Sequence, residues 1–352
     1  MDCADDKTNE APEGNGDRSE DLAQPTLNPK FTVNIRGWDS DNAEEASEFA
    51  RQIGATTLDL SRHLDLSRLE SVVVATDYHE AVSSFDATDQ LSAQPTSNEY
   101  GQGAAMARHI IRDDEFWSVV IIWTPLVRQM ANVGQEGHKS ALHIFVHELV
   151  HVDDLRFFSR TYPGGWRAAK PRDGRDSQLQ GIVNPCQSEY SAQRRSAWAD
   201  PEHGFELLEM LGKALKDVDS QIRNARFEYR FHGNMEVLWP IVSARLTFLF
   251  QCLGYGLGHA DWAIGEKAEN PGLAVKYEEV LSDLAKLPSG WLLKACREAV
   301  QPFYTMKEWT GLEVYDPLIE VVEKLLNQYG MYTSPQDGGI FVSMPYTGFH
   351  DL

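Results

Sequence analysis

The chain has 352 residues and a formal net charge of −21 at pH 7, because 53 acidic side chains outnumber 32 Lys and Arg. A negative field of this size repels phosphate groups, so we expect no nucleic-acid partner. Hydrophobic residues make up 42% of the chain, which is enough to form a sizeable core.

Residues 1–29 are polar and acidic and contain Pro and Gly, a composition typical of a disordered tail. They show neither the basic nor the apolar region of a secretory signal peptide. The four cysteines form no CxxC pair and do not suggest a disulfide framework. We therefore expect a cytoplasmic protein, and secretion as an effector through an uncleaved signal stays open.

Alternating and valine-rich segments follow the tail and predict a small sheet interleaved with helices. We expect a strand over 30–38, a helix over 42–54 that ends at Gly54, a strand over 70–78, a loop over 83–106 and a strand over 116–127. The third strand contains the apolar run "SVVIIW" and should be buried on both faces. A polar break over 132–140 separates this strand from the helix that contains "HIFVHELVHVDDLRFF".

The stretch 159–183 is rich in Gly, Pro and Asp and predicts a long loop, a candidate for the rim or lid of a cleft. Asn184 as N-cap and Pro185 at the first helical position predict a helix over 184–200. The remaining chain is mainly helical. We expect helices over 205–231, 237–258, 273–286, 289–300 and 316–329, and a late strand within 338–349.

The segment 237–258 is the most apolar helix candidate in the chain. Arg245 lies inside it, Pro240 interrupts it, and no basic flank follows it. These features favour a buried helix over a membrane span.

The sequence "HELVH" places two histidines four residues apart and a glutamate beside the first of them. Residues four apart lie on one face of a helix, so His147 and His151 can direct their imidazoles at one point. Such a pair supplies two of the three protein ligands of a typical catalytic zinc site. Glu148 would lie next to the metal-bound water, where it can take a proton and pass it to a leaving group.

This motif resembles the HExxH motif of the zincin metallopeptidases. The resemblance covers the motif helix and the strand before it, which in zincins often forms the edge on which an extended peptide lies. The metzincin continuation HExxHxxGxxH is missing, because positions 154 and 157 are Asp and Phe. The gluzincin pattern implies a glutamate from a later helix. Glu189 in "SEYSAQ" fits that pattern, since a small residue, Ala192, follows three positions later.

Other polar residues near the motif leave alternatives open. Glu202 and His203 are fallback ligands. Asp154 fits a role as acceptor for an imidazole N–H better than a role as ligand. His143 lies one turn before His147 on the same face and would close the coordination position that catalysis needs, so we interpret it as a hydrogen-bonded histidine of the core or cleft.

Zincin peptidases usually also present a Tyr, His or Arg to the oxyanion of the tetrahedral intermediate. Four residues are candidates for this donor: Tyr190, Arg194, His232 and Tyr304. The sequence does not choose among them. We take His232 as the candidate catalytic residue, because its place beside a glycine at a helix break favours exposure.

The predicted elements and the resemblance together imply an α+β fold. A zincin-like catalytic core over 30–200 would contain a small mixed sheet and the active-site helix. A mainly helical subdomain over 201–352 would follow, with the cleft between the two.

The expected function is that of a zinc-dependent hydrolase, a metallopeptidase that cleaves peptide or protein substrates. His147, His151 and Glu189 would bind Zn²⁺, and Glu148 would be general base and then proton donor. The acidic surface favours basic substrates. Two alternatives stay open: an effector or defence protease kept idle by its tails, and a catalytically silent metal-binding interaction protein on the same scaffold.

Overall fold

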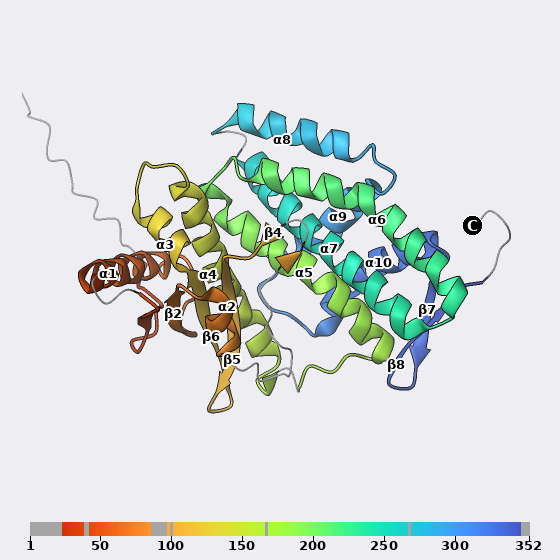
Figure 1. The fold of residues 1–352 in the computed structure, drawn as a ribbon, viewed down its shortest axis with the longest axis horizontal. Coiled ribbons are helices and arrows are strands. Elements are labelled where there is room, and N and C mark those ends of the chain that lie inside the picture. Colours follow the sequence, from red (N-terminus) through yellow and green to blue (C-terminus); the bar gives the residue numbers. More distant parts are fainter. Residues whose placement is uncertain are drawn as a thin grey trace, which may run out of the picture.

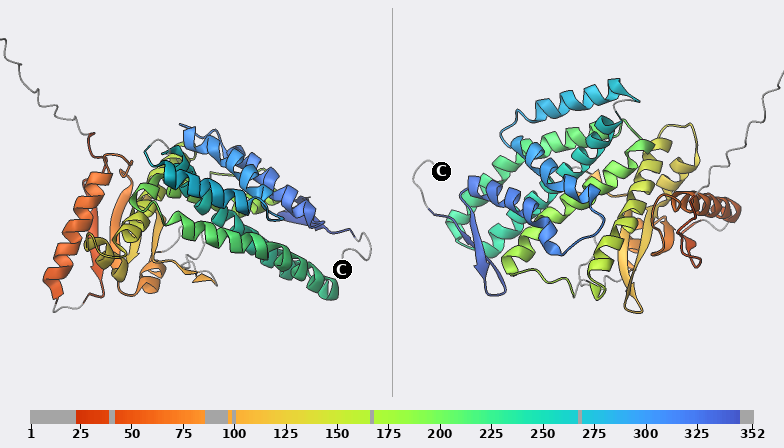
Figure 2. Two further views of the ribbon diagram at one scale, coloured as in Figure 1. Left: turned by 90° about the horizontal axis from the view of Figure 1, so that it is seen from above. Right: turned by 180° about the vertical axis from the view of Figure 1, so that it is seen from behind.

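The computed structural model describes residues 23–38, 42–85, 97–98, 101–165, 168–266 and 269–345. A small sheet with its helices forms one end of the molecule, and a helical bundle forms the other (Figures 1 and 2). The predicted α+β class is therefore confirmed. Most of the predicted disordered tail, residues 1–22, lies outside the described residues.

The main sheet has four strands: β1 (Thr32–Arg36), β2 (Leu69–Ala75), β5 (Ala105–Arg112) and β6 (Glu115–Trp123). Their spatial order is β1-β2-β6-β5. The first three strands of that order are parallel, and β5 runs antiparallel to β6 at the edge of the sheet. The expectation that the strand directly before the motif helix is the edge was wrong, because β6 lies inside the sheet and β5 is the edge.

Part of the segment 83–106, which was predicted as a loop, forms strands at this edge of the sheet. Its described residues include the short strands β3 (Ser97–Asn98) and β4 (Gly101–Gln102) and the beginning of β5. A tight hairpin joins β5 to β6 through Asp113 and Asp114, whose φ angles are +51° and +62°. Two consecutive left-handed residues are typical of a type I′ hairpin, so "RDDE" was the local signal for this strand pair.

Four helices cover the sheet: α1 (Ala43–Leu60), α2 (Tyr78–Ser83), α3 (Thr124–Ala131) and α4 (His138–Thr161). Val72 and Val74 of β2 pack with α1, α3 and α4, whereas Val73 and Ala75 pack with α2 on the other face. Burial on both faces explains the apolar runs VVVA of β2 and VVII of β6. Helix α1 continues through Gly54, because an isolated glycine costs a helix only about 1 kcal/mol.

Helix α5 (Gly174–Ser196) begins ten residues earlier than predicted, so the predicted loop 159–183 shrinks to the segment between α4 and α5. The side chain of Asp173 caps α5 by accepting a hydrogen bond from the backbone N–H of Asp176. Pro185 therefore lies inside the helix instead of at its start. Burial of Leu179 and Ile182 in the helical core offsets the cost of an internal proline.

The rest of the chain is helical apart from one hairpin. Its elements are α6 (Gly204–His232), α7 (Met235–Gly265), α8 (Pro271–Leu284), α9 (Trp291–Thr305), α10 (Asp316–Gln328), β7 (Tyr332–Gln336) and β8 (Gly339–Ser343). The predicted helices and the late strand are all present here, with shifted ends.

Two glycines let α7 lie directly against α5. A Cβ at Gly254 would meet the carbonyl oxygen of Cys186 at 2.5 Å, and one at Gly258 would meet that of Tyr190 at 2.4 Å. No side chain fits at either position, so the backbones approach closely. This contact brings the middle of α7 beside Glu189 of α5.

By length and composition alone, α7 could cross a membrane, with a mean hydropathy of 1.4 over its most apolar window. In this fold it packs between α5 and α6 and contributes many side chains to the helical core (Figure 1). The core helix of a globular protein passes the same composition test, and this packing agrees with the buried helix predicted from the sequence.

Candidate metal centre

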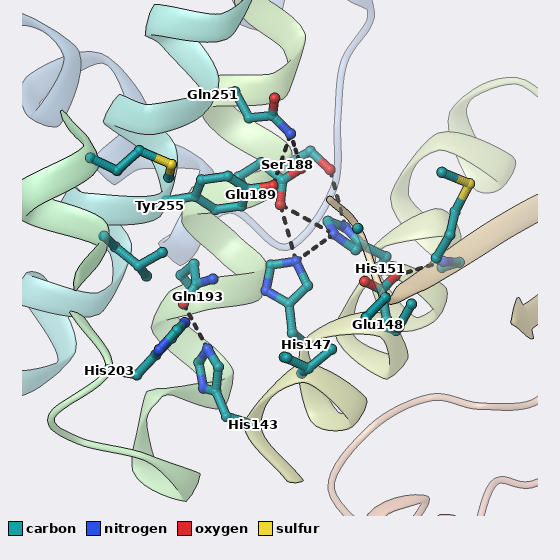
Figure 3. A pocket seen from close by; sticks show the side chains of 18 of the residues that line it. His143, His147, Glu148, His151, Ser188, Glu189, Gln193, His203, Gln251 and Tyr255 are labelled. Atoms are coloured by element: carbon teal, nitrogen blue, oxygen red, sulfur yellow. Dashed lines mark hydrogen bonds and ion pairs between the residues drawn. The ribbon is translucent and has the colours of Figure 1, made fainter. Parts of the chain in front are cut away.

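Helix α4 brings its two motif histidines to one point. Their Nε2 atoms lie 3.1 Å apart, and the ring centroids are separated by 4.7 Å. Both side chains are largely buried. Figure 3 shows the two imidazoles turned toward the same space from successive turns of α4.

Glu189 reaches the same point from α5. Its Oε2 atom lies 3.1 Å from Nε2 of His147 and 3.4 Å from Nε2 of His151. The three potential ligand atoms all lie within 4.8 Å of one another, and this is the single such group of His, Cys, Asp or Glu found in the described part of the chain. The structure thus brings together the two histidines and the glutamate that the sequence singled out.

The chemistry of this group fits a cation between the three side chains. Oε2 of Glu189 is buried and has no hydrogen bond of acceptable geometry, although two Nε2 atoms are in contact with it. A buried polar atom without a hydrogen bond needs an explanation, and an ion is one. Two imidazole nitrogens and one carboxylate oxygen are the donor set of catalytic zinc sites.

Electrostatics in the metal-free chain agree with this fit. Burial acts to lower the pKa of His151, but the adjacent carboxylate of Glu189 outweighs it and raises this pKa to about 9. Burial likewise acts to raise the pKa of Glu189, but both imidazoles hold it well below its usual range. Without a metal, His151 therefore carries the positive charge that offsets Glu189 at neutral pH.

Zinc binding should depend on pH, because a metal ligand must be a neutral imidazole. His151 stays protonated up to about pH 9 in the metal-free chain, so zinc has to displace a proton below that pH. We expect the apparent zinc Kd to fall about tenfold per pH unit between pH 6 and 8. Competition titrations with a chelator at each pH measure this slope, and a pH-independent Kd would contradict it.

The second nitrogen of His151 is held by Ser188. Its Nδ1 atom lies 3.2 Å from the hydroxyl of Ser188, one position before Glu189 on α5. Asp154, predicted as the acceptor for an imidazole N–H, instead accepts a hydrogen bond from Arg195 at 2.9 Å. The predicted contact between Asp154 and an imidazole N–H was wrong, because the hydroxyl of Ser188 on α5 occupies the place beside Nδ1 of His151.

Replacing Ser188 with alanine should weaken metal binding about 10- to 100-fold, because the partner that fixes the ring of His151 is lost. A zinc competition titration on the variant measures the change. Ser220→Ala, which removes an exposed hydroxyl on α6, is the matched control and should leave the zinc Kd unchanged. A wild-type Kd for Ser188→Ala would show that this contact does not orient the ligand.

Glu148 lies between the motif histidines and the edge strand. It is buried, and its Oε2 atom accepts a hydrogen bond of 2.6 Å from the backbone N–H of Ala107 on β5. That N–H points away from β6, toward the space that a further strand would occupy. The carboxylate is therefore adjacent to both the metal group and β5, the edge strand of the sheet among the described residues.

A cavity of about 470 Å³ opens over the metal group. Residues 103–107 of the edge strand and its lead-in form one wall, and Leu207, Met210 and Phe248 form an apolar wall from α6 and α7. Tyr255 of α7 lines the cavity with its ring centroid 6.1 Å from that of His147. Figure 3 shows this tyrosine beside Glu189.

Tyr255 is placed as a neutral hydrogen-bond donor. Its hydroxyl oxygen accepts a hydrogen bond of 2.8 Å from Gln251, so its own proton is available. Burial, followed by the charges of Glu189 and Glu148, raises the pKa of Tyr255 well above its ordinary value. The phenol therefore keeps its proton at neutral pH.

The other histidines and acids near the motif do not join the metal group. Nδ1 of His143 lies 3.1 Å from the carbonyl oxygen of Ser196, and Nε2 lies 2.9 Å from Oε1 of Gln193. His143 is thus the hydrogen-bonded histidine that we expected. The fallback residue His203 contacts the ring of His143, and Glu202 is exposed.

His232 lies far from the metal group. It ends α6, a helix of 29 residues and therefore about 40 Å long, whose first turn is the end near the site. Its Nδ1 accepts a hydrogen bond from the backbone N–H of Asn234, and the residue does not line the cavity. The exposure predicted for His232 holds, but the fold brings the opposite end of its helix to the site.

The remaining oxyanion candidates are engaged elsewhere. Tyr190 donates to Asp261 at 2.6 Å, and Arg194 donates to the hydroxyl of Tyr190. Arg194 also stacks on the ring of Tyr304 at 3.9 Å. None of these residues lines the cavity.

Tyr255 and Gln251 were not predicted as site residues, although the sequence contains a signal for them. Gln251, Tyr255 and His259 lie four residues apart in an otherwise apolar helix, so they share one face. A polar stripe on a buried helix has to meet polar partners, because an unpaired buried polar group is costly. In this structure that stripe faces α5 and the cavity.

Comparison with known proteins gave no match among protein-family models, curated proteins or solved structures. The geometry of the site therefore carries the functional argument.

Proposed function

We propose that this chain is a zinc-dependent peptidase. The observation that supports it is the convergence of His147, His151 and Glu189 from two helices, with Glu148 adjacent and an open sheet edge in the same cavity. Two nitrogens and one carboxylate oxygen favour zinc over magnesium or calcium, which prefer oxygen ligands alone.

Glu148 would act as the general base. Zinc, when bound, lowers the pKa of a coordinated water to about 7 and polarises a carbonyl oxygen. The carboxylate of Glu148 would accept a proton from the attacking water and return it to the leaving amine. It is buried beside the motif histidines and lies within hydrogen-bond distance of the edge strand.

The open edge of the sheet offers a binding site for an extended peptide. Within the described part of the chain, strand β5 pairs with β6 on one side only, and its residues 105–107 line the cavity. A peptide strand added at this edge would take backbone hydrogen bonds from β5. The substrate carbonyl would then replace Glu148 as acceptor for the N–H of Ala107, which frees the carboxylate for proton transfer.

Tyr255 would donate its hydroxyl proton to the oxyanion that forms at the scissile carbonyl. Removing one such donor typically lowers kcat about 10²- to 10³-fold. Tyr255→Phe should show this loss in kcat with little change in KM, because the donor acts in the transition state. Tyr304→Phe, an exposed tyrosine stacked under Arg194, is the control. A kcat for Tyr255→Phe within threefold of wild type would remove the residue from the mechanism.

The proposal is tested with a mixture of synthetic peptides and the zinc-loaded chain. Mass spectrometry should detect new peptide termini, and a chelator should stop their formation until zinc is restored. If no peptide is cleaved while zinc stays bound, the silent metal-binding alternative replaces the peptidase.

A further inference from the structure

The side-chain amide of Gln251 contacts two groups of the candidate site at once. Its Nε2 atom lies 3.2 Å from Oε1 of Glu189 and 2.8 Å from the hydroxyl oxygen of Tyr255. An amide nitrogen carries two hydrogens, so one nitrogen can make both hydrogen bonds. Figure 3 shows Gln251 on the side of Glu189 that faces away from His147.

The chemistry of the three groups fixes how this amide is oriented. A carboxylate can only accept hydrogen bonds, so the nitrogen of Gln251, and not its oxygen, has to face Glu189. The same nitrogen donates its second hydrogen to Tyr255, whose hydroxyl oxygen therefore accepts. The hydroxyl proton of Tyr255 is thereby directed away from Gln251 and is available to an acceptor in the cavity that both side chains line.

The two oxygens of Glu189 have different partners. Oε2 lies within 3.4 Å of the Nε2 atoms of His147 and His151, and Oε1 accepts the hydrogen bond from Gln251. The amide therefore holds the carboxylate with Oε2 toward the point where the two imidazoles converge. Partners of this kind, which bind a ligand but not the metal, typically change metal affinity 10- to 100-fold.

The packing of α7 on α5 sets Gln251 in this position. A Cβ at Gly254 would meet the Cβ of Glu189 at 3.0 Å, so the backbone of α7 lies directly against the turn of α5 that carries this glutamate. Gln251 and Tyr255 are four residues apart and share one face of α7. The amide is thus held by a rigid contact between two helices.

We propose that Gln251 is a positioning residue that uses one amide group to orient both Glu189 for the metal and Tyr255 for the oxyanion. Its role toward Tyr255 rests on the proposed peptidase function. Its role toward Glu189 requires metal binding alone, so the two roles are tested separately.

The first test is a zinc competition titration on the full chain carrying Gln251→Met or Gln251→Leu. Both replacements remove the amide and are residues that a helix accommodates well. Each should weaken the zinc Kd about 10- to 100-fold, because Oε1 of Glu189 loses its donor. Gln301→Met, at an exposed position of α9, is the matched control and should leave the Kd unchanged. Circular dichroism checks that the helices are retained.

The second test measures kcat and KM at saturating zinc in two backgrounds. In the wild-type chain, Gln251→Met should lower kcat about tenfold with KM within threefold, because the proton of Tyr255 is no longer directed into the cavity. In the Tyr255→Phe chain the same change should lower kcat threefold or less, since the group that Gln251 orients is already missing. A merely structural role predicts the same loss in both backgrounds.

A zinc Kd within threefold of wild type for both Gln251 variants would overturn the role toward Glu189. An equal loss of kcat in the two backgrounds would overturn the role toward Tyr255. If the wild-type chain binds zinc but hydrolyses no peptide, the peptidase proposal and the role toward Tyr255 fail together. The zinc titration then still decides whether Gln251 orients Glu189.

Discussion

Replacing Glu148 with glutamine should lower peptide hydrolysis about 10³-fold while the chain still binds one zinc ion. Glutamine keeps the shape of the side chain but cannot accept a proton, and general-base catalysis contributes typically 10²- to 10⁴-fold. That loss corresponds to roughly 4 kcal/mol of activation free energy. The metal group itself should be intact, because Glu148 is not one of its three side chains.

Two measurements on purified Glu148→Gln decide the result, namely zinc content and the initial rate on one cleaved peptide. Glu136→Gln, an exposed position just before α4, is the matched control and should behave as wild type. A variant that retains more than a tenth of the wild-type rate would remove Glu148 as the base. A variant that loses zinc would show that Glu148 helps to hold the metal.

Replacing Glu189 with alanine should weaken zinc binding by more than about 100-fold, since the loss of a partner outside the coordination shell already costs 10- to 100-fold. The change removes the oxygen that lies within 3.4 Å of both Nε2 atoms. It also removes the main interaction that raises the pKa of His151, so the residual zinc binding should depend less on pH between about pH 7 and 9, where His151 of the wild-type chain is still protonated.

A competition titration with a chelator measures the zinc Kd of Glu189→Ala, and circular dichroism checks that the helices are retained. Glu202→Ala removes an exposed glutamate that the sequence also allowed as a ligand, and it should leave the zinc Kd unchanged. The reverse pattern, in which Glu202→Ala loses zinc and Glu189→Ala keeps it, would contradict the assignment of the third ligand.

The three candidate metal ligands, His147, His151 and Glu189, were predictable because local sequence patterns mark each of them. The spacing of His147 and His151 fixes their common face once the segment is a helix. Glu189 was predicted as the third ligand because it lies in a later helix and has small residues near it in the sequence. The small residues on α7, Gly254 and Gly258, then allow the close contact that sets this helix beside α5.

The edge strand and the start of α5 were not predictable in the same way. The alternation of β5 is interrupted by His109 and by charged residues, because this strand covers a face of the cavity as well as the sheet. Pro185 normally marks a helix start, but tertiary packing of Leu179 and Ile182 extends α5 in front of it. In both segments, burial against residues distant in the sequence determined the structure and outweighed the local preference of the residues.

Whether Tyr255 and His232 lie near the cavity depends on how the helices pack against one another. The spacing of residues along the chain does not reveal that packing. A residue near a helix break can lie at either end of a long helix relative to a site. His232 ends α6, and the first turn of that helix is the end beside the cavity. Tyr255 lies within an apolar helix and reaches the cavity only because α7 packs on α5.

Anomalous diffraction from crystals of the chain grown with zinc, recorded on both sides of the zinc absorption edge, tests the central claim most directly. We predict one strong anomalous peak within about 2.0–2.2 Å of Nε2 of His147, Nε2 of His151 and a carboxylate oxygen of Glu189. A map with no peak between these three side chains, or a zinc ion bound elsewhere in the chain, would contradict the account.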